Sequence, residues 1–220
     1  MKKLLLIIAT VTSVQFAAIA QDSTFTKQME TNVSKLDNAK AVGDYQVLAN
    51  DFTRLADSKK TEWLPYYYAA FCNAKISWLY QQNADKIEPF ANLAEQQIKK
   101  TEAMLDMAKN KIELSEVYCV LSMVNRARVF ISPMSNGKKY GPIAKEYIQK
   151  ALQFNSENPR ANYLAAWEKY YTPKLWGGDK DKAKVFLDLA MKQLENKPST
   201  TTFPRWGKSE CEAILTSYNK

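Results

Sequence analysis

A helix–turn–helix unit from Asn158 to Leu194 constrains the fold more than any other stretch, because weaker copies of it recur upstream. Asn158 followed by Pro159 is a good helix start, since asparagine caps free amides and proline has no amide to leave unpaired. The second half of the unit places apolar residues on one face of a helix: Ala183, Phe186, Leu187, Ala190, Met191 and Leu194. Neither helix can bury its apolar face alone, so the unit requires neighbours.

The rest of the chain alternates helical patterns with short polar breaks, and almost nothing in it is typical of a strand. We expect helices at about residues 25–40, 45–56, 62–80, 88–108, 112–130, 143–154 and 203–218. Residues 132–142, with two glycines and two prolines, predict a long break, and Tyr140 within it is a candidate exposed aromatic residue. Gly177 and Gly178 are expected to end one helix, and Asp179 to cap the next.

The second helices of the expected hairpins share a pattern of alanine, a large residue and a small residue. It occurs as Ala94, Ile98, Thr101; as Ala144, Ile148, Ala151; and as Ala183, Leu187, Ala190, with Ala49, Thr53, Ala56 in the same frame. Small residues let helix axes approach closely, and the large residue fills the space between them. The first helices carry a small residue at Ala69 and Ala165, although Val120 takes this position in the middle unit. The pattern predicts stacked helix hairpins.

These units resemble tetratricopeptide repeats, which are helix–turn–helix units of about 34 residues. The resemblance covers residues 40–195, and the proline after Asn158 is similar to the one that marks junctions between such repeats. It implies an all-α fold: a right-handed superhelix of about four antiparallel helix hairpins, followed by a C-terminal capping helix. The final residues 204–218 and the turn at residues 170–179 also resemble segments of small exported repeat proteins of Gram-negative bacteria.

The N-terminus reads as a cleavable signal peptide over residues 1–20. Lys2 and Lys3 precede an apolar run, and small residues lead to a cleavage point near Ala20 and Gln21. The run is shorter than the roughly 20 residues that cross a bilayer, and no later run is longer. We therefore expect one domain over residues 21–220 that does not span the membrane and is periplasmic or secreted.

Composition excludes several classes of function. Without the signal segment, 29 basic and 23 acidic residues leave a net charge of +6, and their even distribution argues against nucleic-acid binding. The chain has no histidine, which excludes Ser-His-Asp and Cys-His catalysis and every His-ligated metal. Cys72, Cys119 and Cys211 lack metal-site spacing, so we favour buried thiols, with a Cys72–Cys119 disulfide as the alternative.

No motif indicates catalysis, a cofactor or a metal site. Carboxylate pairs such as Glu113 with Glu116 fall on faces expected to be solvated. The Gly177–Gly178 pair lacks the lysine and hydroxyl residue of a phosphate-binding loop. We therefore expect a protein that binds rather than one that catalyses.

By the repeat resemblance, the first helix of each hairpin lines a concave groove. This places the following residues there: Tyr66, Asn73, Asn125, Arg128, Asn162, Lys169 and Tyr170. Asparagine can pair with a peptide backbone, while arginine and lysine can hold a carboxylate. Trp176, beside the glycine turn, and Tyr140 are expected on a shared edge of the stack, as a second contact surface.

The leading prediction is therefore an exported, non-catalytic scaffold that binds a protein or peptide of the cell envelope. The alternative is a small-ligand-binding component of a transport system, with a pocket formed by the aromatic residues 66–78. A ligand that stabilises the native state would distinguish the alternative from the scaffold.

Overall fold

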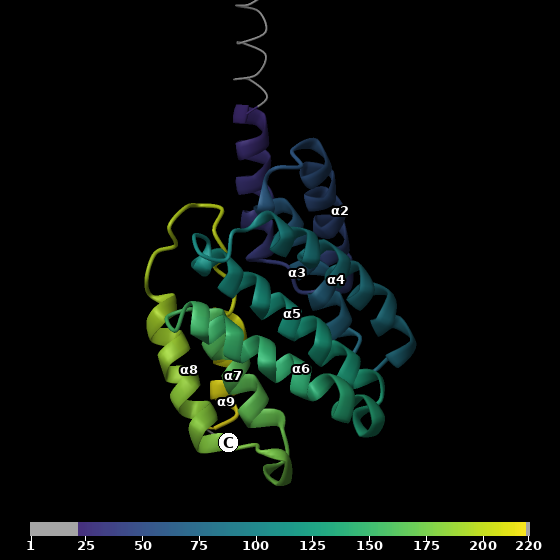
Figure 1. Ribbon diagram of the computed structural model, residues 1–220, viewed down its shortest axis with the longest axis vertical. Helices are drawn as coiled ribbons and strands as arrows, with labels where there is room; N and C mark the ends of the chain where they lie inside the picture. Colours follow the sequence, from purple (N-terminus) through teal and green to yellow (C-terminus); the bar gives the residue numbers. More distant parts are fainter. Residues whose placement is uncertain (1–21, 219–220) are drawn as a thin grey trace, which may run out of the picture.

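The computed structural model describes residues 22–218, and every regular element among them is helical (Figure 1). A helix over residues 22–36 precedes α2 (Val42–Ser58), α3 (Trp63–Leu79), the short η1 (Ala84–Lys86), α4 (Ile87–Met104), α5 (Lys111–Ile131), α6 (Pro133–Phe154), α7 (Pro159–Tyr171), η2 (Lys174–Trp176), α8 (Lys180–Leu194) and α9 (Lys208–Thr216). The all-helical prediction is confirmed. The predicted signal peptide lies outside the described residues, and none of the described helices is both long and apolar enough to cross a bilayer.

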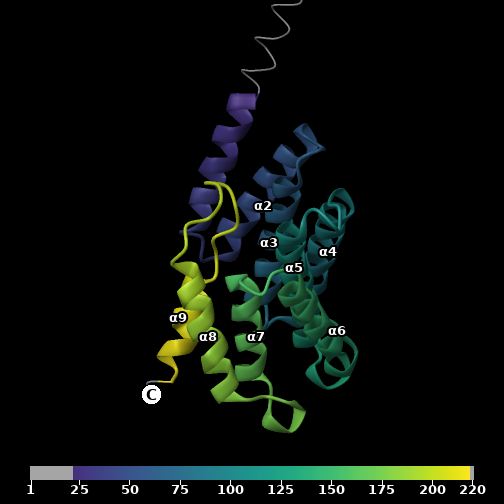
Figure 2. The same cartoon turned by 60° about the vertical axis from the view of Figure 1, so that its left-hand side comes forward.

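Helices that follow one another pack side by side as hairpins, α3 with α4, α5 with α6, and α7 with α8 (Figures 1 and 2). The first helices α3, α5 and α7 also contact one another, so the hairpins stack. This arrangement is the helical-repeat type of fold that the sequence predicts. That the repeats are of the tetratricopeptide type in particular stays a prediction.

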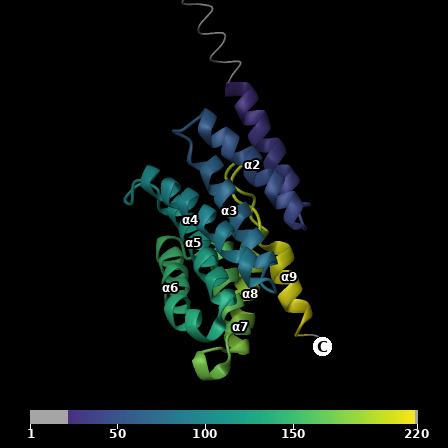
Figure 3. The same cartoon turned by 90° about the vertical axis from the view of Figure 1, so that its right-hand side faces the viewer.

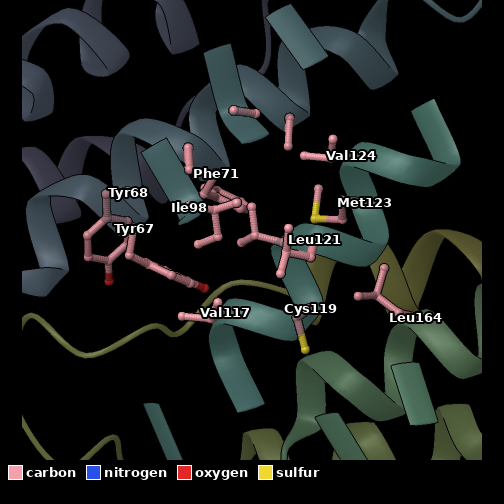
Figure 4. Packing of buried hydrophobic residues seen from close by; sticks show 14 of the residues in the cluster. Tyr67, Tyr68, Phe71, Ile98, Val117, Cys119, Leu121, Met123, Val124 and Leu164 are labelled. Carbon is pink, nitrogen blue, oxygen red and sulfur yellow. The ribbon is translucent and has the colours of Figure 1, made fainter. Parts of the chain in front are cut away.

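The small residues lie where successive helices meet, as predicted. Ala94, Ala144, Ala151, Ala183 and Ala190 of the second helices and Ala69 and Ala165 of the first helices are all buried. In the core, Tyr67 and Phe71 of α3, Ile98 of α4, Leu121 of α5 and Leu164 of α7 belong to one cluster (Figure 4). Alanine therefore allows close approach while the large residues fill the space between the helices.

Replacing Ala190 by Leu is expected to lower the free energy of unfolding by about 1 to 3 kcal/mol, because the added atoms overpack a filled contact. The matched control is Lys192→Leu in the same helix, since Lys192 is exposed and the change there is expected to stay within about 0.5 kcal/mol. Urea denaturation measures both. Equal losses in the two variants would show that Ala190 does not lie in a tight contact.

The α7–α8 hairpin begins and turns as its sequence predicts. The Asn158 side chain accepts hydrogen bonds from the amides of Arg160 and Ala161, and Asp179 accepts one from Lys182. Gly177 adopts a left-handed conformation with φ of 91°, and a β-carbon at Gly178 would overlap the Thr172 carbonyl. Two glycines are therefore needed to place α8 against α7.

The long break predicted at residues 132–142 is wrong, because α6 begins at Pro133 and includes these residues. Pro133 occupies the first turn, where its missing amide costs nothing. The Asn136 side chain donates a hydrogen bond to the Arg128 carbonyl, which ties the first turn of α6 to the end of α5. Tyr140 is accordingly a helical residue, half-buried, and its ring lies 5.5 Å from the Arg128 guanidinium.

All three cysteines are buried free thiols, so the favoured prediction is confirmed and the Cys72–Cys119 disulfide is not formed. Burial raises the pKa of each thiol, and for Cys211 it does so to about 12. These thiols therefore behave as small apolar groups at neutral pH.

The C-terminal segment, defined here as residues 195–207, crosses the first helices without regular structure (Figures 2 and 3). The Trp206 ring stacks on Phe71 of α3 at 4.8 Å, and its indole nitrogen donates to the Tyr67 hydroxyl at 2.9 Å. Tyr68 donates to the Thr202 carbonyl at 2.8 Å. The helix predicted from residue 203 therefore begins only at Lys208, and the segment before it packs against α3.

A buried ion pair joins α5 to α7 beneath this segment. Arg160 donates from two nitrogens to the Glu116 carboxylate at 2.6 to 3.1 Å, and the Tyr67 hydroxyl donates to Oε2 of the same group at 3.2 Å. Burial opposes the charge of Arg160, but Glu116 more than offsets it and raises the pKa of the guanidinium. The sequence predicts Glu116 on a solvated face, and this prediction is wrong because Glu116 is fully buried.

Candidate functional site

The three asparagines predicted to line a groove are buried, and their amide nitrogens are bonded within the chain. Asn73 donates to the Ala69 carbonyl and to Gln97, and Asn125 donates to the Leu121 carbonyl. Asn162 donates to the carbonyls of Ser156 and Asn158 and to Gln193. Asn73 and Asn162 therefore connect the two helices of their hairpins, Asn125 bonds within α5, and all three amides are buried.

Tyr66 and Arg128 are also buried. The Arg128 guanidinium lies 2.7 Å from Glu95, 2.8 Å from Asn92 and 3.3 Å from Glu88, all on the preceding hairpin. The Lys100 ammonium lies over the Tyr66 ring, 5.6 Å from the ring centre. Arg128 is therefore occupied in joining two hairpins.

The remaining three predicted residues gather where α7 turns into α8. Lys169 donates to the Gly177 carbonyl at 2.9 Å, and Tyr170 lies under the Lys180 ammonium, 4.9 Å from its ring centre. Trp176, in η2, is 64% exposed. The structure thus brings Lys169, Tyr170 and Trp176 into one region and leaves the other five predicted residues in the interior.

A row of aromatic rings leads to this region along the C-terminal ends of α3, α5 and α7. We call it the aromatic edge, and it comprises Trp78, Phe130, Trp167, Tyr171, Tyr170 and Tyr218. Successive rings in this order have centres 4.9 to 5.9 Å apart. Tyr171 is exposed and the other five rings are half-buried, so the row offers ring faces and polar hydroxyls to a ligand at its tyrosine end.

A cavity of about 640 Å³ opens beside the exposed end of the aromatic edge. It is lined by Lys169, Tyr170, Tyr171, Thr172, Pro173, Lys174, Gly178, Asp179, Lys180 and Asp181. Its volume lies within the range of about 300 to 1,000 Å³ found for small-molecule sites. We call it the α7–α8 cavity; the turn that forms it projects from the lower end of the molecule in Figure 1.

The residues around the α7–α8 cavity are apolar and positively charged. Leu175 is 88% exposed and Tyr171 is 52% exposed, so with Trp176 they form an apolar rim that no part of the described chain covers. Lys169, Lys174 and Lys180 lie in the lining with two carboxylates, Asp181 and Asp179, and Asp179 is held by its capping bond to the Lys182 amide, so basic groups remain in excess. A planar apolar ligand with acidic substituents fits this combination best.

The surroundings of Tyr171 keep its hydroxyl neutral. Burial raises the pKa of the Tyr171 hydroxyl, and the neighbouring Tyr170 raises it further. Burial lowers the pKa of the nearby Arg126 guanidinium. The Glu168 carboxylate, 3.1 Å from that guanidinium, offsets part of this effect. The ring faces, rather than phenolate oxygens, are therefore what the aromatic edge presents at neutral pH.

A second cavity, of about 430 Å³, lies between the helix over residues 22–36, α3 and the C-terminal segment. Aromatic rings line it, among them Tyr45, Tyr68, Phe71 and Trp206. Two pairs of charged groups meet there, Arg205 with Asp37 at 2.7 Å and Glu210 with Lys75 at 2.8 Å, and Lys208 and Glu212 line it as well. Because its lining holds more acidic than basic side chains, it is a weaker candidate for an acidic ligand than the α7–α8 cavity.

Sequence reasoning missed Tyr171, Leu175 and the lysines Lys174 and Lys180. Their signal was the pair of tyrosines that ends α7, two residues before Pro173, and that leaves the Tyr171 ring half outside the stack. The aromatic edge could not be found in this way, because Trp78, Phe130 and Trp167 are far apart in the sequence.

No protein-family model matches the chain, and no curated protein sequence matches it. Among solved structures, the chain is similar to the HusA haemophore from Porphyromonas gingivalis. The two share 29% sequence identity and a TM-score of 0.77, over 88% of this chain and 92% of the haemophore chain.

This similarity corrects the leading functional prediction. A scaffold for a protein or peptide partner is not what the comparison supports, because the similar structure is that of a haemophore, which by its name carries a small ligand. The burial of these residues is consistent with this correction, since most of the predicted groove residues are buried and bonded within the chain. The alternative prediction, small-ligand binding, is the better supported one.

Proposed function

We propose that the chain is a carrier of a planar, acidic tetrapyrrole such as haem, held at the α7–α8 cavity. The observation that carries this proposal is the likeness to the HusA haemophore across nearly the whole of both chains. The aromatic edge supports it independently, because tilted and edge-to-face aromatic rings with nearby lysines match the chemistry of a porphyrin and its two carboxylates.

In the proposed complex, one face of the macrocycle lies on Tyr171 and the Trp176 indole packs against it. Both side chains are more than half exposed before binding, so covering them removes apolar area from water. Lys174 and Lys180 pair with the carboxylates at the rim of the cavity.

The proposed complex does not depend on the iron. The chain has no histidine, its three cysteines are buried, and burial raises the pKa of Tyr171, which disfavours a phenolate. These are the side chains, apart from methionine, that hold haem iron. We therefore expect metal-free protoporphyrin to bind about as tightly as haemin in absorbance titrations, within a factor of about ten. Binding of haemin alone would instead indicate an iron ligand.

The Tyr171→Ala, Trp176→Ala variant is expected to bind haemin about 10- to 100-fold more weakly, because each exposed aromatic anchor contributes on the order of 1 kcal/mol or more. Titration of the Soret absorbance measures the affinity. The matched control is Met107→Ala, Ile112→Ala, which removes two exposed apolar side chains at the opposite end of α5. An unchanged affinity in the first variant, with folding intact, would exclude this site.

We further infer that the carrier acts outside the cytoplasm, as a periplasmic or secreted protein. The pattern of residues 1–20, two lysines followed by an apolar run and small residues, supports export. Expression of the full chain in a Gram-negative host and mass measurement of the exported protein test this. A mature chain that begins at Gln21 is expected, and an uncleaved cytoplasmic chain would contradict it.

A further inference from the structure

Two hairpin turns share one end of the molecule: the α5–α6 turn and the α7–α8 turn. Helices α5 and α7 run in the same direction, since Glu116 meets Arg160 near their starts and Phe130 meets Trp167 near their ends. Their following turns therefore project from the same edge, as the views in Figures 1 and 3 agree.

Both turns carry large apolar side chains that point away from the stack. Met134, at the start of α6, is 75% exposed, and Leu175 and Trp176 stand out from the other turn. Prolines 133 and 173 stiffen the chain next to them and are exposed as well. Large apolar side chains are exposed to water here, whereas most others in the chain are buried in the core. Such exposed apolar side chains are typical of an interaction surface.

The same two turns carry an excess of positive charge. Residues 130–142 and 169–179 contain Lys138, Lys139, Lys169 and Lys174 and one acidic residue, Asp179, which accepts the capping bond from the Lys182 amide. Lys138, Lys139 and Lys174 are exposed, and none of them forms a salt bridge among the described residues. The excess of lysine over acidic residues along this edge therefore favours an anionic partner.

We propose that this edge docks on the surface of an anionic lipid bilayer. Met134, Leu175 and Trp176 enter the headgroup layer, where tryptophan and isolated apolar side chains are stable, and the lysines bind lipid phosphates. Projecting apolar tips flanked by unpaired lysines fit a deformable lipid interface better than the fixed surface of an acidic protein. This proposal goes beyond ligand binding and does not require it.

Co-sedimentation with phospholipid vesicles tests the proposal. The wild type is expected to sediment with vesicles of equal parts phosphatidylglycerol and phosphatidylcholine, weakly with phosphatidylcholine alone, and less as salt increases. The Lys138→Glu, Lys139→Glu variant is expected to partition at least about tenfold less, and Met134→Ser, Leu175→Ser to lose binding in the same direction. The control is Lys109→Glu, Lys111→Glu, at the opposite end of α5.

Lipid docking and porphyrin binding can fail separately. Lys138 and Lys139 do not line the α7–α8 cavity, so their charge-reversed variant is expected to keep the haemin affinity of the wild type. Absence of wild-type sedimentation, or equal sedimentation of the variant and its control, would overturn the docking proposal. The proposal would also be overturned if this edge bound an acidic protein of the cell envelope but did not bind the vesicles.

Discussion

The Glu116→Gln variant is expected to lose about 3 to 5 kcal/mol of unfolding free energy, because it leaves a buried guanidinium without its counter-charge. Glu116 is fully buried and both of its oxygens accept hydrogen bonds from Arg160. The amide fills the same space but can neither neutralise Arg160 nor accept at both positions. The Tyr67 hydroxyl, which also donates to this carboxylate, loses a charged acceptor in the same change.

Urea denaturation followed by circular dichroism measures this loss. Glu157→Gln is the matched control, since Glu157 is exposed just before α7, and its change is expected within about 0.5 kcal/mol. The Glu116→Leu, Arg160→Met variant, which removes both charges, is expected to regain much of the stability. If Glu116→Gln were as stable as the wild type, the ion pair would not hold α5 against α7.

The Trp206→Ala variant is expected to destabilise the protein by about 3 to 5 kcal/mol, the range for removing a packed tryptophan. Trp206 stacks on Phe71, meets Tyr163 edge-on at 6.2 Å and donates to Tyr67. It is the residue that fastens the C-terminal segment to both α3 and α7. Its removal leaves a cavity in this contact and frees the segment from the stack.

Trp176→Ala is the matched control for the same substitution. The Trp176 ring is mostly exposed, so its loss is expected to change the melting temperature little while weakening haemin binding. Trp206→Ala should show the opposite balance: a large fall in melting temperature, with haemin affinity kept at temperatures where the variant is folded. Equal effects of the two variants on stability would contradict the assigned position of the C-terminal segment.

Local signals in the sequence predict most of the helical stack. The Asn158–Pro159 start, the glycine turn and the apolar faces depend on residues within a few positions of one another, and each appears as expected. Alanine at positions such as Ala94 and Ala183 predicts close helix contacts because the space between two helices is set by side-chain size. The exception is α6, where two prolines and two glycines indicate a break. Pro133 in the first turn and the bond from Asn136 to α5 favour the helix instead.

Contacts between distant segments could not be predicted in this way. Thr202 and Trp206 meet Tyr68 and Phe71 more than 130 positions away, and no periodicity encodes that meeting. The buried positions of the predicted groove residues could not be foreseen for the same reason, because Asn73 and Asn162 bond to Gln97 and Gln193, which only the folded stack brings close. At the candidate site, Tyr170 and Trp176 were predicted, while the aromatic edge behind them depends on three separate helices.

Amide chemical-shift mapping with protoporphyrin tests the central claim, that a planar acidic ligand binds at the α7–α8 cavity. The expected result is that the largest shifts on addition of the ligand fall at Trp167, Tyr170, Tyr171 and Trp176, next to the α7–α8 cavity. Shifts centred on Tyr45, Tyr68, Phe71 and Trp206 would place the ligand in the second cavity, and an unchanged spectrum would exclude tetrapyrrole binding; either result would contradict the account.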